Sequence, residues 1–65
     1  MELQEAHDIA KKGKLVKFND IKYTIDAIIY QYIKPKGRWE YCLRLKDLRT
    51  NSVIIADMKK VEVVG

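Results

Sequence analysis

Apolar positions follow a helical spacing in the first dozen residues and a strand-like spacing after them. Between residues 2 and 12 they recur at intervals of three and four, with Lys11 and Lys12 in the last turn, where the helix dipole favours cations. Gly13 then provides a C-terminal stop. So short a helix is marginal alone and needs a docking surface. The expected docking stripe is Leu3, Ala6, His7 and Ala10, with Ile9 at its margin.

From residue 14 onward, apolar and polar side chains alternate with the period of two that is typical of half-buried strands. The predicted strands are residues 14–18, 21–34, 38–46, 52–57 and 61–64. Asn19-Asp20 predicts a two-residue turn, and Pro35-Lys36-Gly37 predicts a three-residue loop between the two longest strands. Residues 58–60 interrupt the alternation and predict a single 3₁₀ turn. We expect one domain, residues 1–65, that is mainly β and preceded by a short α-helix.

The loop of the longest hairpin sets a strand register. Proline favours the first turn position, and Gly37 can adopt the left-handed conformation that closes such a loop. The expected opposing pairs are Val16–Tyr23, Phe18–Ile21, Lys34–Arg38, Ile33–Trp39, Ile29–Leu43, Ile25–Leu45, Leu45–Val53 and Leu43–Ile55. Because side chains alternate across a strand, this register places the odd positions of the central hairpin on the core face. That expected core face is Ile21, Tyr23, Ile25, Ala27, Ile29, Ile33, Trp39, Tyr41, Leu43 and Leu45.

The same register predicts an apolar patch with basic neighbours on the outer face of the sheet. The candidate partner-binding residues of this patch are Ile28, Tyr30, Tyr32, Arg44, Lys46 and Ile54. Monomers rarely leave such a patch bare. In one interpretation the N-terminal helix covers the patch, and in a second the patch binds a protein partner or a second copy. In a third its tyrosines stack on nucleic-acid bases, and in a fourth a register error or a bulge turns these side chains inward.

Basic and aromatic residues also gather at the tip of the central hairpin. Lys34, Lys36 and Arg38 surround the loop, and Trp39 follows directly. Such a cluster can grip a phosphate backbone. The alternative is a solvated tip, with Trp39 closing one end of a barrel, and we favour it because hairpin tips commonly carry lysine.

The net charge and the number of cysteines indicate what kind of partner the protein favours and in which cellular compartment we expect it. The 65 residues include thirteen basic and nine acidic side chains, and the formal charge of +4 favours acidic partners. The single cysteine, Cys42, excludes an intramolecular disulfide and suits a reducing compartment. The polar N-terminus lacks a signal-peptide pattern, and no apolar run is long enough to cross a bilayer. We expect a cytoplasmic protein.

Residue types that carry catalysis are sparse. The only histidine, His7, has no partner at a motif spacing, and one histidine with one cysteine cannot form a four-ligand zinc site. The carboxylates are scattered, and Asp26 is expected to form a surface pair with Lys46. We expect no enzyme, and no catalytic, metal or cofactor site.

The predicted order of five strands, of which the second is very long and the last follows a turn, resembles the SH3-like small barrel over residues 14–64. The chain departs from the peptide-binding SH3 domains, because Asn19-Asp20 replaces their long loop after the first strand and the ligand-binding residues that it carries. Recognition of proline-rich ligands is therefore not expected. The free-standing chain also resembles small accessory proteins of phages and mobile elements.

The short-looped members of that fold include protein-binding and nucleic-acid-binding modules, so the resemblance leaves function open. The sequence predicts a small non-enzymatic interaction module that binds a protein partner or associates with itself. The alternative is weak, largely non-specific nucleic-acid binding through a basic and aromatic surface. We expect no membrane partner and no small-molecule substrate.

Overall fold

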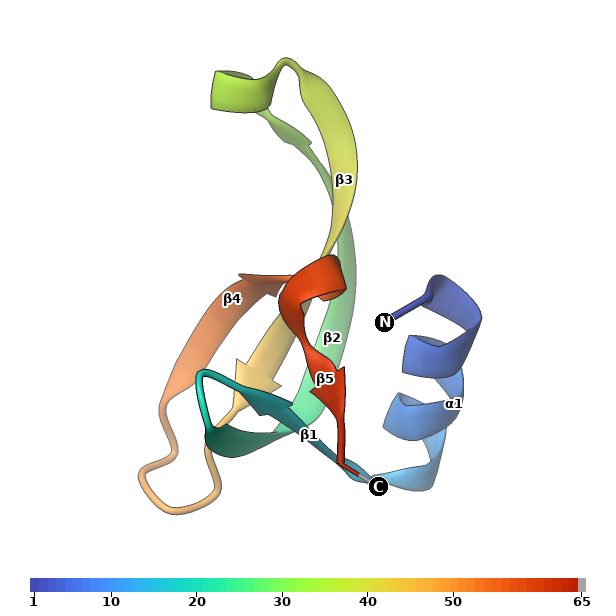
Figure 1. Cartoon of the computed structure of the whole chain (residues 1–65). Helices are drawn as coiled ribbons and strands as arrows, with labels where there is room; N and C mark the ends of the chain where they lie inside the picture. Colours follow the sequence, from blue (N-terminus) through green and yellow to red (C-terminus); the bar gives the residue numbers. More distant parts are fainter. Residues whose placement is uncertain (65) are drawn as a thin grey trace.

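One antiparallel sheet carries the fold in the computed structural model, which describes residues 1–64. The elements are α1 (Leu3–Lys12), β1 (Leu15–Phe18), β2 (Ile21–Ile33), the 3₁₀ turn η1 (Lys34–Lys36), β3 (Arg38–Lys46), β4 (Val53–Asp57), the 3₁₀ turn η2 (Met58–Lys60) and β5 (Glu62–Val63). The strand order across the sheet is β4-β3-β2-β1-β5 (Figure 1). The prediction of a mainly β chain with five strands after a short helix is confirmed.

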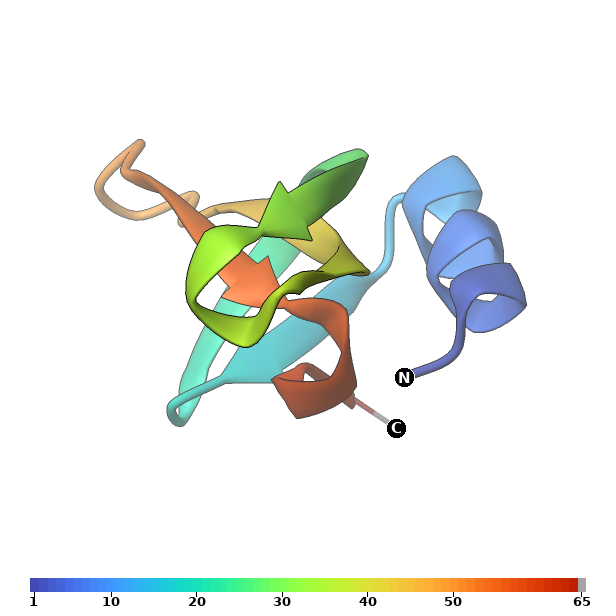
Figure 2. The ribbon, with the colours of Figure 1, turned by 90° about the horizontal axis from the view of Figure 1, so that it is seen from above.

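The sheet curls but does not close. Seen from above, β4 and β5 come round toward each other, and η2 carries the chain from one to the other (Figure 2). Within residues 1–64, β4 pairs only with β3 and β5 pairs only with β1, so both remain edge strands. The predicted closed five-stranded barrel is therefore not confirmed, and the structure is an open, curled sheet.

The first hairpin forms as the sequence predicts. Asn19 and Asp20 both adopt positive φ, at 51° and 62°. Left-handed geometry at both central positions defines a type I′ turn, whose twist matches that of the flanking strands. Val16 opposes Tyr23 and Phe18 opposes Ile21, which confirms the predicted register.

The loop of the central hairpin is one residue longer than the predicted three-residue loop. Residues 34–36 form η1, and Gly37 follows with φ 66° and donates its N–H to the Ile33 carbonyl at 2.8 Å. Ile33 therefore opposes Arg38 and Tyr32 opposes Trp39, so the predicted pairs Lys34–Arg38 and Ile33–Trp39 are wrong by one residue. The predicted Ile29–Leu43 pair is wrong for the same reason, because Ile28 opposes Leu43.

A β-bulge at Asp26 restores the predicted register near the body of the sheet. The pairing shifts between Ile25 and Ala27, so that Ile25 opposes Leu45 as predicted. Beyond the bulge, the even positions of β2 join the core side and the odd positions leave it, because a shift of one residue exchanges the faces of a strand. The residues predicted for the core but placed on the opposite face are Ala27, Ile29 and Ile33.

The fourth strand is also shifted by one residue from its predicted pairing. Leu45 opposes Ile54 and Leu43 opposes Ala56, so the predicted pairs Leu45–Val53 and Leu43–Ile55 are wrong. Ala56 is consequently buried and Ile54 is partly buried against the core. Val53 and Ile55, which were expected inside, are 47% and 52% exposed on the outer face.

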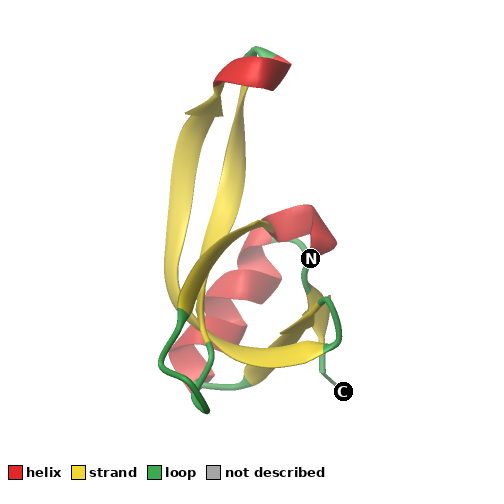
Figure 3. Cartoon of the chain, turned by 90° about the vertical axis from the view of Figure 1, so that its left-hand side faces the viewer, coloured by secondary structure: helices red, strands yellow, loops and turns green. Residues whose placement is uncertain are grey.

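Helix α1 is docked and supplies part of the hydrophobic core. It packs against β2 and lies beside β5 (Figures 1 and 3). Ala6 and Ile9 are buried in the main core cluster, and burying an isoleucine contributes roughly 1.5–3 kcal/mol. His7, expected in the docking stripe, is exposed. The buried residues of the cluster are Ala6, Ile9, Val16, Tyr23, Leu43, Leu45, Ala56, Met58 and Val61.

Candidate binding surface

The outer half of the central hairpin projects beyond the rest of the sheet (Figures 1 and 3). The β4 strand accompanies β3 only as far as the pair Cys42–Asp57, whereas the pairing of β2 with β3 continues to Ile33 and Arg38. No other strand among residues 1–64 covers this outer half. Side chains there pack mainly against their own hairpin neighbours, η2 and the end of β4 at Asp57.

Four aromatic rings line the core-side face of this projecting hairpin. Tyr30 opposes Tyr41 and Tyr32 opposes Trp39, so all four share one face. The rings of Tyr30 and Trp39 stack with centroids 5.4 Å apart and an interplanar angle of 20°. The Tyr30 and Tyr41 centroids are 4.6 Å apart, and Trp39 meets Tyr32 edge-on at 5.8 Å. We call this continuous row of Tyr30, Tyr32, Trp39 and Tyr41 the aromatic surface.

Three of the four rings are largely open to solvent. Tyr30 and Trp39 are each 57% exposed and Tyr32 is 51% exposed, whereas Tyr41 is partly buried against the core. Contacts between aromatic rings of this kind are worth about 0.5–1.5 kcal/mol each. Contiguous exposed apolar area of this type is characteristic of interaction sites. The row therefore runs from the core out to the hairpin tip and is available to a partner along most of its length.

A shallow hollow lies where the aromatic surface meets η2. Its volume is about 370 Å³, and its lining residues are Tyr30, Arg38, Trp39, Glu40, Tyr41, Asp57, Met58 and Lys59. Met58 is buried, while Lys59 is exposed. The hollow therefore has an aromatic wall and an apolar base, and charged residues of both signs also line it.

The opposite face of the same hairpin carries a charged cluster. The buried carboxylate of Glu40 lies 3.2 Å from the Lys36 Nζ and 3.2 Å from the Arg38 Nε. The hydrogen bond from Lys36, followed by that from Arg38, lowers the pKa of Glu40 even though burial opposes the shift. Lys36 also lies 3.7 Å from Asp57 at the end of β4, so its side chain connects the hairpin tip to the sheet edge.

The predicted tip cluster is therefore divided between two faces. Trp39 belongs to the aromatic surface, but the charged groups of Lys36 and Arg38 point to Glu40 on the other side. Lys34 is exposed in η1. The tip is exposed to solvent, as the favoured alternative to phosphate binding expects, but Trp39 is too exposed to close the end of a barrel, so that part of the alternative is wrong.

The six residues predicted as one partner-binding patch lie in three places. Tyr30 and Tyr32 belong to the aromatic surface. Ile28 and Ile54 face inward and pack against the core, which is the outcome of the bulge and the shifted register. Arg44 and Lys46 lie on the opposite face.

The ionic partner of Arg44 also differs from the sequence prediction. Arg44 binds Asp26 at 3.2 Å, so the predicted Asp26–Lys46 pair is wrong. The sequence candidates did not include Tyr41 of the aromatic surface or Lys59, which lines the hollow beside it. Tyr41 was placed correctly on the core side, but only the observed register joins it to Tyr30.

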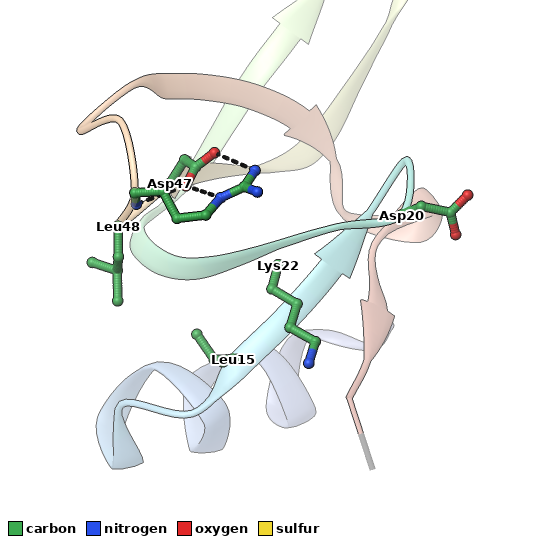
Figure 4. Close-up of a pocket in the computed structure, with 6 residues that line it drawn as sticks. Leu15, Asp20, Lys22, Asp47 and Leu48 are labelled. Atoms are coloured by element: carbon green, nitrogen blue, oxygen red, sulfur yellow. Dashed lines mark hydrogen bonds and ion pairs between the residues drawn. The ribbon is translucent and has the colours of Figure 1, made fainter.

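A second hollow, of about 370 Å³, opens at the other end of the molecule between the β1–β2 turn and the β3–β4 loop (Figure 4). Its lining residues are Leu15, Asp20, Lys22, Asp47, Leu48 and Arg49.

The buried Asp47 accepts hydrogen bonds from the Arg49 backbone at 2.9 Å and from the Arg49 Nη2 at 3.2 Å. These bonds lower the pKa of Asp47 and raise that of Arg49. The pair fixes the loop, because the Asp47 carbonyl also accepts the Asn51 N–H at 2.8 Å.

Reactive side chains stay apart in the described part of the chain. Residues 1–64 contain no group of three or more histidine, cysteine, aspartate or glutamate side chains that could hold a metal ion. Cys42 is buried, with the Gln31 Nε2 3.3 Å from its sulfur. None of the helices in residues 1–64 has both the length and the apolar character needed to cross a membrane.

Comparison with known proteins does not place the chain in a family. No family model matches it, and no curated protein or solved structure matches it either. The surfaces described above are therefore the basis on which a function is proposed.

Proposed function

We propose that the chain is a small non-enzymatic interaction module that binds a protein partner through the aromatic surface. The observation that carries the proposal is the exposure of Tyr30, Tyr32 and Trp39, each more than half open, in one row on a projecting hairpin. Rings exposed in this way add little to folding, because they remain largely hydrated. Tryptophan and tyrosine are also the side chains that most often dominate binding energy at protein interfaces.

The ring geometry favours a protein over nucleic acid. Tyr30 is stacked on Trp39 and makes a tilted contact with Tyr41, so its ring already has two aromatic neighbours. A stacked base needs an open ring face, whereas a protein side chain or carbonyl can contact ring edges and tyrosine hydroxyls equally well. The hollow beside η2 also offers an apolar base for an anchoring side chain.

The charges around the surface indicate the character of the rim. Lys34 and Lys59 take part in no ion pair within residues 1–64, whereas Lys36 and Arg38 are held by Glu40. A partner with acidic groups around an apolar centre complements this arrangement, since charge at a rim acts mainly on the rate of association.

The SH3-like small barrel remains our proposal for the fold family, in a partly open form. The pairing of β5 with β1 and the 3₁₀ turn η2 before β5 support it, because together they bring the end of the sheet back to its beginning. The two-residue turn between β1 and β2 also supports the expectation that proline-rich ligands are not recognised.

Weak nucleic-acid binding is the second candidate function. The formal charge of +4 and the exposed side chains of Lys34 and Lys59 favour it. Such binding would be dominated by phosphate contacts and would weaken steeply with salt.

The proposal is tested with three immobilised forms of the chain in extracts of its source cells. Wild type and Leu48→Ala, an exposed change at the far end of the molecule, should retain the same partner protein. Trp39→Ala should lose it. The partner is then purified, and its dissociation constant for Trp39→Ala should be at least about thirtyfold that for wild type, as expected for a hot-spot residue worth about 2 kcal/mol.

Equal retention by all three forms would contradict the role of the aromatic surface. A salt titration with fluorescent single-stranded and double-stranded oligonucleotides tests the second candidate in parallel. Binding that falls steeply with salt and depends on Trp39 would replace the protein partner with nucleic acid. The absence of oligonucleotide binding at low salt would eliminate that candidate.

A further inference from the structure

The edge strand β4 lacks the features that usually protect a sheet edge. Between Val53 and Ala56 its residues are all apolar, and its pairing with β3 contains no bulge. Natural edges are commonly protected by charged side chains, proline, bulges or very short strands. The other edge, β5, has only two paired residues and lies beside α1. Within residues 1–64, β4 is therefore the sheet edge to which a further strand can pair.

The hydrogen-bond pattern shows which β4 groups face outward. The Asp47 N–H donates to the Ser52 carbonyl at 2.9 Å, which makes Asp47–Ser52 a hydrogen-bonded pair. Such pairs alternate along an antiparallel ladder. The pairs of Val53, Ile55 and Asp57 with β3 are therefore the non-bonded type, and the backbone groups of these three residues point away from β3.

We propose that β4 pairs with β4 of a second copy in antiparallel orientation, about a two-fold axis at Ile55. In this register Ile55 opposes Ile55 of the second copy, and Val53 opposes its Asp57. The N–H and C=O groups of Ile55 then pair with those of Ile55 in the second copy, and the Asp57 N–H of each copy donates to the Val53 C=O of the other. The inward residues Ile54 and Ala56 also face each other, so the core sides of the two sheets are continuous.

Charge complementarity supports a second copy as the occupant. Lys46 lies beside Val53 on the outer face of the sheet. In the proposed register the Asp57 of the second copy lies on the other side of the same Val53. Lys46 can reach across to that carboxylate, because two strand spacings amount to about 9.6 Å and lysine is long and flexible. It would join Lys36 of the second copy, which lies 3.7 Å from the same carboxylate, and the Lys59 N–H, which donates to it at 3.0 Å. The two-fold axis repeats this ion pair, so each dimer has two.

The dimer leaves the aromatic surface free. Two antiparallel copies of β4 direct their projecting hairpins to opposite ends of the joined sheet, since each hairpin extends past the Asp57 end of its own β4 (Figure 1). The assembly would then present two aromatic surfaces, and it does not depend on the function proposed for them.

Sedimentation of the full chain from micromolar to millimolar concentration tests the pairing. Wild type should shift from monomer to dimer with rising concentration. Ile55→Lys places two like charges opposite each other and should raise the dissociation constant of the dimer by about tenfold or more. Val63→Lys, the matched change on the β5 edge, should leave it unchanged, and circular dichroism checks that both variants are folded.

A cross-link identifies the register. Opposed residues of a hydrogen-bonded antiparallel pair have Cα atoms about 5.5 Å apart, within the range of a disulfide. Ile55→Cys should therefore form a covalent dimer under mild oxidation, while Val63→Cys should not, with the buried Cys42 present in both. A wild type that stays monomeric throughout the concentration range would overturn the proposal. Equal dimerisation of Ile55→Lys and Val63→Lys would overturn it as well.

Discussion

Tyr30 stacks on Trp39 diagonally across the central hairpin, with ring centroids 5.4 Å apart and planes inclined by 20°. The residues directly opposite them are Tyr41 and Tyr32 respectively. The diagonal contact therefore joins two cross-strand pairs into one row of four rings. Removing a central ring should disturb the whole row, although the core lies elsewhere.

Tyr30→Ala should change the environment of Trp39, the single tryptophan of the chain. We expect its fluorescence emission to move to longer wavelength, because the indole loses its stacked neighbour and becomes more hydrated. The free energy of unfolding should fall by only about 1 kcal/mol, the worth of an aromatic pair. Leu48→Ala is the control, and identical emission spectra for Tyr30→Ala and wild type would show that the stack does not form in solution.

Gly37→Val should lower the free energy of unfolding by more than about 1 kcal/mol, because a β-branched residue resists positive φ. Gly37 has φ 66°, and a Cβ there would have only the Tyr32 hydroxyl near it, at 3.9 Å. The loss therefore comes from the backbone and not from a clash. Gly37→Asn should cost less, since asparagine tolerates the left-handed region. A thermal midpoint equal to that of wild type for Gly37→Val would contradict the observed loop.

Ile9→Ala should destabilise the chain by about 2–5 kcal/mol, the usual cost of this substitution in a core. A single core in a chain this small supplies about 3–5 kcal/mol in total, so much of the population should unfold. His7→Ala is the matched control on the exposed side of α1 and should change stability by less than about 0.5 kcal/mol. Denaturant titration measures both.

Deletion of residues 1–12 should have the same effect as Ile9→Ala or a larger one, because it removes Ala6 and Ile9 together. We expect the truncated chain to unfold or to associate through the bared core. Denaturant titration measures the unfolding, and sedimentation measures the association. A truncated chain that remains monomeric with an unaltered denaturation midpoint would mean that α1 is not part of the fold.

Glu40 should make stability depend on pH in the acid range. Its pKa in the folded chain lies below the ordinary value of 4.5, so the stabilisation is fully present above that value and is lost as the pH falls through the lowered pKa. Glu40→Gln should therefore be less stable than wild type near neutral pH, and the difference should shrink on acidification. Thermal unfolding from about pH 7 to about pH 2.5 measures this difference. A constant difference throughout would show that Glu40 is not held by Lys36 and Arg38.

Local signals predicted the strands, the turns and the helix closely. Asn19-Asp20 and Gly37 adopt the backbone conformations that their chemistry favours. The register of the outer hairpin was wrong because the loop at 34–37 is one residue longer than predicted. The strand pattern could not reveal the error, since residues 27–29 are apolar at every position and fit either face. Nothing in the sequence marks Asp26 as a bulge, since a charged residue also fits a solvent-facing strand position.

The binding surface depended on that register. Tyr30 and Tyr32 were selected from the sequence and are indeed exposed, but they were grouped with Arg44 and Ile54, which lie elsewhere. Grouping residues on one face requires the exact number of residues in a loop and in each strand. A single extra residue in the loop at 34–37 was enough to exchange the cross-strand neighbours of every ring in the aromatic surface.

The alternation of faces beyond the bulge at Asp26 determines how the length of the projecting hairpin can change, in evolution or by design. An insertion of one residue in each strand, between the bulge and the rings, would reverse the faces of everything outside it and would turn the rings of Tyr32 and Trp39 to the face that carries Arg44. An insertion of two residues in each strand would keep the faces and lengthen the hairpin by about 6.6 Å. The reach of the aromatic row is thus adjustable in discrete steps, while the sheet and helix below it stay the same.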